Sequence, residues 1–303
     1  MKKNNHGISC YTSSIVKILN YYYIDKSEEE LFFSEKLLEL KCESESDGIY
    51  TDLEMMVNMS LDDCGIEIKN IPVHCRLELI ALLRKFGMLL LKIDCRYLEY
   101  AEVFKNAFTE QRKHYIVVKN VIDDYIEIAD TYIPSTPITI YEGKLEIPED
   151  GFENMEFKFV DISGMKERRG LKNTIILEKM MLGYLSNIDE VYKRFLLNLD
   201  YIRLSDSDSK CKKILLYEMA TALSVSGTIA SRKIFYTLLK EIGTVPDALV
   251  LDMSKVASKY NTLRLLLLKA YVNLNKENLD NIIQKAQEIK EFEFVIYTKI
   301  LNH

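Results

Sequence analysis

The sequence predicts an α+β domain built around an antiparallel sheet, followed by an all-α domain. Helical and strand-like patterns alternate up to about residue 165, whereas the remainder follows almost only the 3.6-residue apolar period of amphipathic helices. The charged stretch 164–170, which has a glycine at each end, separates the two patterns as a linker would. We therefore expect domains over residues 1–165 and 171–303.

Composition and charge exclude several classes of protein. The 303 residues are 48% hydrophobic and 28% charged, which is typical of a globular protein with a sizeable core. The formal net charge of −6 gives no electrostatic reason to expect a nucleic acid or an anionic membrane as partner. No apolar run approaches the ~20 residues of a membrane helix, and the first residues lack the apolar core of a secretory signal. We expect a cytoplasmic protein with reduced cysteines.

The elements of the first domain follow from short-range signals. Cys10–Tyr22 carries apolar residues at helical spacing, and Ser27 with Glu30 forms a capping box that predicts the start of a second helix. Asp123-Asp124 is a turn signal. Further helices are predicted at Thr51–Met59 and Arg76–Phe86, and strands at Met88–Ile93, His114–Val121, Tyr125–Ala129 and Phe152–Val160.

The second domain contains amphipathic helices without any spacing typical of a catalytic site. Gly243 ends one helix and Pro246 precedes the next. The predicted helices are Thr174–Tyr184, Asp189–Leu199, Lys210–Val225, Thr228–Ile242, Asp247–Asn275 and Glu277–Tyr297.

The sequence contains one candidate catalytic triad, which consists of Cys10, His114 and Asp130. Cys10 starts a helix, whose free N–H groups and partial positive charge favour the thiolate. His114 opens one strand and Asp130 closes the next, so a turn centred on Ile122 would place them opposite each other, with Cβ atoms about 4.5–5.5 Å apart. A carboxylate so placed holds an imidazole in one tautomer and leaves its other nitrogen for a thiol. Each residue alone has a more ordinary structural interpretation, and the joint pattern carries the hypothesis.

Several segments resemble the butirosin biosynthesis protein H-like family over roughly residues 5–135. They are Cys10–Tyr22 with Ser27–Phe33, then Ile93–Tyr100, His114–Val118 and Ile128–Asp130. More distantly, the order Cys, His, Asp is similar to that of papain-like cysteine peptidases. The resemblance implies a papain-like fold in which Cys10 is the nucleophile, His114 the base and Asp130 the residue that orients it.

The same resemblance implies an acyltransferase of natural-product biosynthesis. Such an enzyme moves an acyl group from the thioester of an acyl carrier protein, through an acyl-cysteine, to a small amine acceptor. The phosphopantetheine arm arrives with the carrier protein, and no bound cofactor or metal is implied. Helical second domains also occur in this family, in agreement with residues 171–303.

The sequence departs from the papain-like pattern near the nucleophile. Papain-like enzymes carry a glutamine a few residues earlier that helps to hold the oxyanion, and Asn4 and Asn5 are the candidates for that role here. Tyr11 replaces the usual glycine beside the cysteine and is expected to narrow the cleft, with Tyr97 and Tyr100 as further lining residues.

Two other functions stay open at this stage. The same triad could hydrolyse a peptide or another amide, or the chain could be a non-catalytic scaffold of a biosynthetic assembly. A metal site is not expected, because His6, Cys10, His74 and Cys75 match no zinc spacing, and adjacent His74 and Cys75 would point to opposite faces of a strand.

Overall fold

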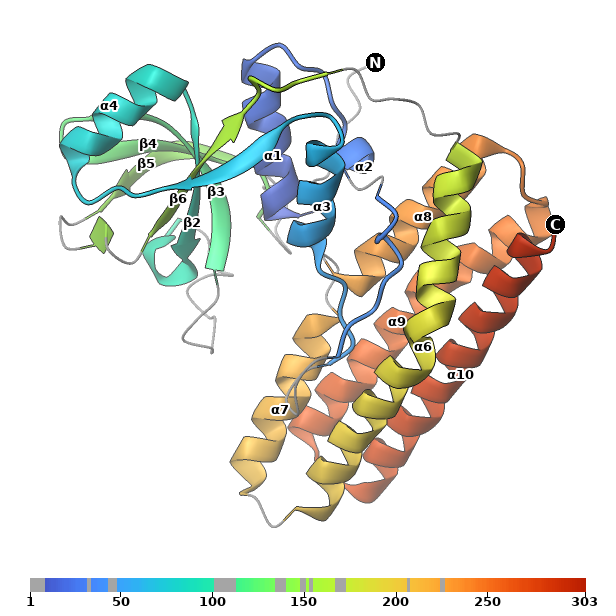
Figure 1. The fold of residues 1–303 in the computed structure, drawn as a ribbon. Coiled ribbons are helices and arrows are strands. Elements are labelled where there is room, and N and C mark those ends of the chain that lie inside the picture. Colours follow the sequence, from blue (N-terminus) through green and yellow to red (C-terminus); the bar gives the residue numbers. More distant parts are fainter. Residues whose placement is uncertain are drawn as a thin grey trace. The chain divides into compact units, whose positions relative to one another are not determined.

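The protein is an α+β molecule of two compact units, as the sequence predicts. The computed structural model describes residues 9–31, 34–42, 48–100, 113–133, 140–147, 151–152, 155–166, 173–205, 208–223 and 227–303. One unit comprises residues 1–31 and 57–168 and contains the sheet, and the other comprises residues 32–56 and 169–303 and contains the long helices (Figure 1).

The sheet of the first unit has six strands within the described residues. Their order across the sheet is β1 (Glu67–Ile71), β6 (Glu156–Asp161), β2 (Leu89–Asp94), β3 (Lys113–Ile122), β4 (Tyr125–Asp130) and β5 (Tyr141–Glu146). Each strand runs antiparallel to its neighbours. β2 and β3 are largely buried, whereas β1 and β5 lie at the edges and are mostly exposed. The sequence patterns predicted neither edge strand, because partly polar segments of five or six residues carry little apolar signal.

Two helices cover opposite faces of this sheet. The Tyr115 ring on β3 lies 4.6 Å from the Tyr11 ring on α1 (Cys10–Tyr21). The next residue, Ile116, packs in a core cluster with Leu79 and Leu83 of α4 (Arg76–Phe86). Successive residues of a strand face opposite sides, so α1 and α4 lie on different faces.

The described short helices of this unit are α2 (Glu28–Leu31) and the 3₁₀ turn η1 (Cys95–Tyr97). The helix α3 (Leu53–Asp62) belongs to this unit from Val57 onward. The capping box at the start of α2 is confirmed, because Glu30 N donates to Ser27 Oγ at 3.2 Å and Ser27 N donates to Glu30 Oε2 at 3.3 Å.

The described helices of the second unit are α6 (Asn173–Leu204), α7 (Ser209–Ala222), α8 (Thr228–Ile242), α9 (Asp247–Val272) and α10 (Lys276–Leu301). The predicted break between Tyr184 and Asp189 is wrong, since α6 is one continuous helix of 32 residues. The two polar residues at that point are accommodated: Ser186 Oγ donates to the carbonyl of Gly183 at 2.8 Å, and Asn187 Nδ2 donates to the carbonyl of Leu40 at 3.1 Å.

Residues 32–56 pack with the helices, although the predicted domain boundary placed them with the sheet. Leu37, Leu38 and Leu40 are fully buried. The carbonyl of Leu38 accepts a hydrogen bond from Arg232 Nη2 at 3.2 Å. The segment contributes apolar side chains and carbonyl groups to the core of the helical unit, and such long-range contacts leave no local trace in the sequence.

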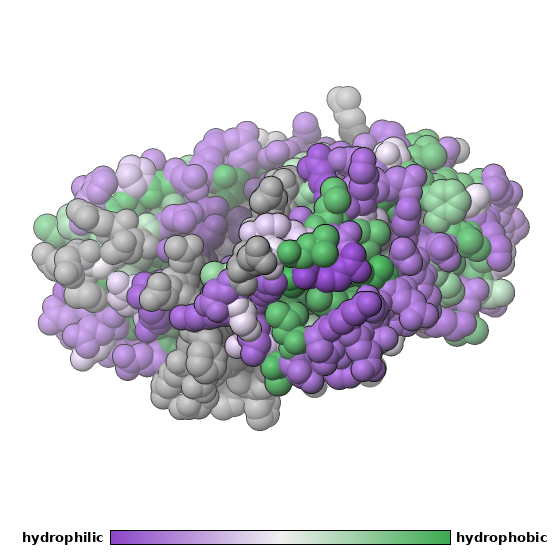
Figure 2. Space-filling model, turned by 90° about the horizontal axis from the view of Figure 1, so that it is seen from below, coloured by the Kyte–Doolittle hydropathy of each residue, from purple (hydrophilic) through white to green (hydrophobic). Residues whose placement is uncertain are grey.

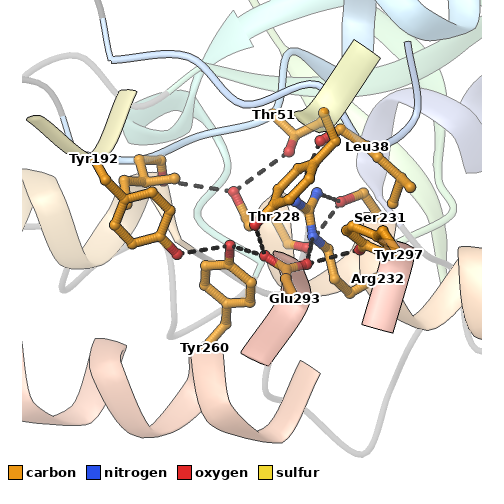
Figure 3. Close-up of polar contacts among 11 residues, drawn as sticks. Leu38, Thr51, Tyr192, Thr228, Ser231, Arg232, Tyr260, Glu293 and Tyr297 are labelled. Carbon is orange, nitrogen blue, oxygen red and sulfur yellow. Dashed lines mark hydrogen bonds and ion pairs between the residues drawn. The ribbon is translucent and has the colours of Figure 1, made fainter. Parts of the chain in front are cut away.

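A buried ion pair lies in the core of the helical unit. Arg232 Nε donates to Glu293 Oε1 at 2.9 Å, and both side chains are inaccessible to solvent. Tyr260 and Tyr297 also donate hydrogen bonds to the Glu293 carboxylate (Figure 3). Tyr184 donates a further one. Burial disfavours the charge on Arg232, but Glu293 holds the pKa of the guanidinium well above its ordinary value, so Arg232 stays charged.

The surface is mixed in character. Figure 2 shows mostly hydrophilic residues on the face it presents, with hydrophobic residues gathered over part of the helical unit. Among the described residues, no helix combines the length and the apolar content needed to cross a membrane.

Candidate active site

Cys10 occupies the first position of α1, as the sequence predicts. Its side chain is half-buried. Ser9 caps the helix, because its Oγ accepts a hydrogen bond from Thr12 N at 3.1 Å. The N–H group of a first-turn residue has no acceptor inside its own helix. The Cys10 thiol therefore lies at the helix end that carries free donors and a partial positive charge.

A buried carboxylate that sequence reasoning missed, Glu28, fixes this first turn. Glu28 Oε2 accepts from Thr12 Oγ1 at 2.6 Å, and Oε1 accepts from Ser13 Oγ at 2.8 Å. In the sequence, Glu28 is one of three consecutive glutamates, and no local signal distinguishes it. Its negative charge offsets the partial positive charge that the N-terminus of α1 places near Cys10.

The imidazole of His114 lies beside Cys10, and the carboxylate of Asp130 is its hydrogen-bond partner. His114 Nε2 lies 2.9 Å from Asp130 Oδ2, and both side chains are buried. The Cys10 side chain is a second hydrogen-bond partner of the imidazole. Because Asp130 occupies Nε2, Nδ1 is the nitrogen left for the thiol. The three residues thus form the chain Cys10, His114, Asp130.

The predicted register between His114 and Asp130 is wrong, although the two residues meet. Strands β3 and β4 pair Val117 with Ala129, so the next step places Asp130 opposite Ile116. The turn lies at 123–124 instead of 122, and a bulge between Val118 and Asn120 shifts the register again. His114 is therefore the diagonal neighbour of Asp130 on one face of the sheet, within reach of a carboxylate.

The environment of His114 stabilises the imidazolium. Burial by itself lowers the pKa of His114, but the charge of Cys10 and the hydrogen bonds that the imidazole makes to Asp130 and Cys10 outweigh it and raise the pKa to about 10. At neutral pH the imidazole is protonated when its partner is a thiolate. Such an ion pair is the reactive form of a cysteine nucleophile.

Asp130 is held by further donors. Tyr100 Oη donates to Asp130 Oδ2 at 2.7 Å, and Tyr132 N donates to Oδ1 at 3.1 Å. The Tyr100 ring stacks on Tyr141 of β5, with centroids 4.0 Å apart and planes 5° apart. Burial and the Asp130 charge raise the pKa of Tyr100 above its ordinary value, so the phenol stays a donor. Tyr100 therefore contacts the triad directly, in addition to any role in lining a cleft.

The other residues singled out from the sequence have different placements. Tyr11 is buried, and its Oη donates to Asn58 Oδ1 at 2.6 Å, so it anchors α1 instead of narrowing an open cleft. Tyr97 is partly buried and packs against the sheet core. Asn4 and Asn5 lie outside the described residues.

No group of three or more potential metal ligands occurs among the residues that the structure describes. Neither a protein-family model nor a curated protein matches the sequence. Evidence on function therefore comes from the geometry of the chain itself. A buried imidazolium between a carboxylate and a thiol at a helix N-terminus can perform nucleophilic acyl chemistry.

Proposed function

We propose that this protein is a cysteine-dependent acyl-transfer enzyme with Cys10 as nucleophile. The single observation that carries the proposal is the chain of contacts from Cys10 through His114 to Asp130. A structural role explains this arrangement poorly, because burying a histidine beside a carboxylate and a half-buried thiol brings desolvation costs that a purely apolar core avoids.

The reaction follows from the protonation states. The Cys10 thiolate attacks the carbonyl carbon of a thioester; the new C–S bond forms as the old one breaks, and the departing thiolate takes the proton of the His114 imidazolium. An amine then attacks acyl-Cys10, neutral His114 takes the amine proton, and the amide leaves as the Cys10 thiolate is regenerated. Asp130 keeps the imidazole oriented throughout. The Cys10 N–H is one candidate donor to the oxyanion.

Two finer features rest on the family resemblance. We propose a papain-like catalytic unit, which is supported by a nucleophile-bearing helix packed on an antiparallel sheet that carries His114 and Asp130. We propose further that the donor is an acyl thioester on the phosphopantetheine arm of a carrier protein, and that the acceptor is a small amine. The latter assignments come from the sequence resemblance alone.

Thiol reactivity tests the nucleophile without knowledge of the substrate. Cys75 is the matched control, because it also lies at a helix N-terminus and is half-buried. At pH 6 an ordinary thiol with a pKa of about 8.5 is roughly 0.3% ionised. We expect iodoacetamide to alkylate Cys10 on the order of 100-fold faster than Cys75, after allowance for the weaker nucleophilicity of stabilised thiolates. His114→Ala should reduce the rate at Cys10 to that at Cys75. Equal rates in the wild-type protein contradict the proposal.

A thioester substrate tests the transfer. Wild-type protein incubated with an acyl-pantetheine thioester should carry the acyl mass on the peptide that contains Cys10, and an added primary amine should remove it as the amide. Cys10→Ala should form neither product, whereas Cys75→Ala should form both. Release as the free acid despite the amine would make the protein a hydrolase, and unchanged turnover by Cys10→Ala would refute the mechanism.

A further inference from the structure

The helical unit has an apolar groove between α6 and α10, away from the catalytic residues in the sequence. The groove has a volume of about 820 Å³. Leu196, Leu197, Phe294 and Val295 form its apolar lining. Leu197 is 57% exposed, Phe294 49% and Val295 46%. Leu204, two turns after Leu197 along α6, is 73% exposed. A solvent-facing stripe of this kind on neighbouring helices is typical of an interaction surface.

The charges along the groove have both signs and a symmetric arrangement. Lys193 and Asp200 line the groove on α6, on either side of the Leu196–Leu197 pair. The midpoint between Leu196 and Leu197 is 3.5 residues from each charge, or about 5 Å along the helix. When two identical helices pack antiparallel and cross at that midpoint, a residue a given distance before the midpoint lies opposite the residue the same distance after it on the second copy. Lys193 therefore comes level with Asp200 of a second copy, and this happens twice, on either side of the axis.

A second pair of charges follows the same rule. Glu190 and Arg203 are also equidistant from the midpoint, so Glu190 comes level with Arg203 of a second copy. Both are exposed, and each has only a neighbour on its own helix as ion-pair partner among the contacts of the described residues: Arg194 for Glu190 and Asp200 for Arg203. The face is thus complementary to itself, as a two-fold interface requires.

We propose that this face is the interface of a homodimer in which α6 and α10 pack against α6 and α10 of a second copy around a two-fold axis at Leu196–Leu197. The apolar stripe forms the centre of the interface, and the Lys193–Asp200 pairs fix its register. The edge of the groove carries both acidic and basic side chains, which disfavours a partner with only negative charge. An acidic helix or an anionic lipid surface would place its negative charges against the carboxylates of the groove.

Molar mass in solution tests the dimer. Wild-type protein in size-exclusion chromatography with light scattering should show twice the mass of the chain at concentrations on the order of 10 μM, about tenfold above a Kd of 1 μM. Leu197→Asp should give the mass of the monomer with an unchanged circular dichroism spectrum, because the side chain is exposed. Leu251→Asp is the matched control: Leu251 is 62% exposed on α9 and does not line the groove, so the mass should stay that of the dimer.

Charge reversal tests the two-fold register. Lys193→Glu and Asp200→Lys should each weaken the dimer at least about tenfold in Kd, because each places two like-charged pairs across the axis. An equimolar mixture of the two variants should recover the dimer mass, since both pairs are complementary in the heterodimer, and the double variant should recover it as well. A monomeric wild-type protein overturns the proposal, and so does a dimer that Leu197→Asp and Lys193→Glu leave unchanged.

Discussion

The buried ion pair of the helical unit provides a sharp test of how this fold is stabilised. Glu293→Gln keeps the size of the side chain and removes its charge. The carboxylate accepts four hydrogen bonds, from Arg232, Tyr184, Tyr260 and Tyr297, at distances between 2.5 and 2.9 Å. An amide replaces one acceptor oxygen by a donor, so two of these four donors lose their partner. Arg232 cannot lose its proton and becomes a buried charge without a counter-ion.

The expected loss of stability follows from these contacts. Breaking a buried ion pair by removing one partner costs about 3–5 kcal/mol. Losing two hydrogen bonds to a charged acceptor, at about 1.5–3 kcal/mol each, gives about 3–6 kcal/mol. The two figures describe one effect and are not added. We expect Glu293→Gln to lower the free energy of unfolding of the helical unit by about 3–5 kcal/mol. The total for a domain is about 5–15 kcal/mol, so the variant should unfold at clearly lower urea.

Urea denaturation followed by far-ultraviolet circular dichroism measures this loss. Glu288→Gln is the control, because Glu288 lies on the same helix as Glu293 but is exposed. It forms ion pairs with Lys259 of α9 and Lys285 of α10, and removing its charge should cost no more than about 1 kcal/mol. If Glu293→Gln costs no more than the control, the ionised, fully hydrogen-bonded pair is the wrong description of this core.

Three further predictions concern the sheet unit and the segment packed on the helices. The pKa of His114 is raised to about 10 from an ordinary value of about 6.5, so the stabilisation by its charge is fully present below about pH 6.5 and is lost as the pH rises to about 10. The difference in free energy of unfolding between wild type and His114→Gln, measured in urea, should therefore narrow between pH 6 and 10. A constant difference would contradict the raised pKa. Tyr100→Phe removes one of the donors to the Asp130 carboxylate and should lower the free energy of unfolding in urea by about 1.5–3 kcal/mol. Gly48→Ala would place a methyl carbon 2.7 Å from the backbone of Met219. The free energy of unfolding, measured by thermal denaturation, should fall by about 1–3 kcal/mol.

Local patterns determined the elements whose signals span a few residues. α4 and α8 have the predicted bounds, because turn and cap residues delimit a clear apolar period. The capping box at Ser27 formed as predicted, since both hydrogen bonds join residues three apart. Cys10 at the start of α1 belongs to the same category. The sequence also indicated that His114 and Asp130 come from adjacent strands of a hairpin, which is enough to bring them near each other.

Tertiary structure alone decided the contacts that link distant parts of the chain. The bulge near Val118 set the register that makes His114 and Asp130 diagonal neighbours, and a single added residue in a strand leaves no periodic signal. Glu28 became a buried acceptor for Thr12 and Ser13 only when α2 met α1. Arg232 and Glu293, 61 residues apart, look like ordinary surface charges in an amphipathic pattern, and only helix packing encloses them. Sequence thus determines structure that is stabilised within one element, whereas burial and long-range pairing depend on which elements meet.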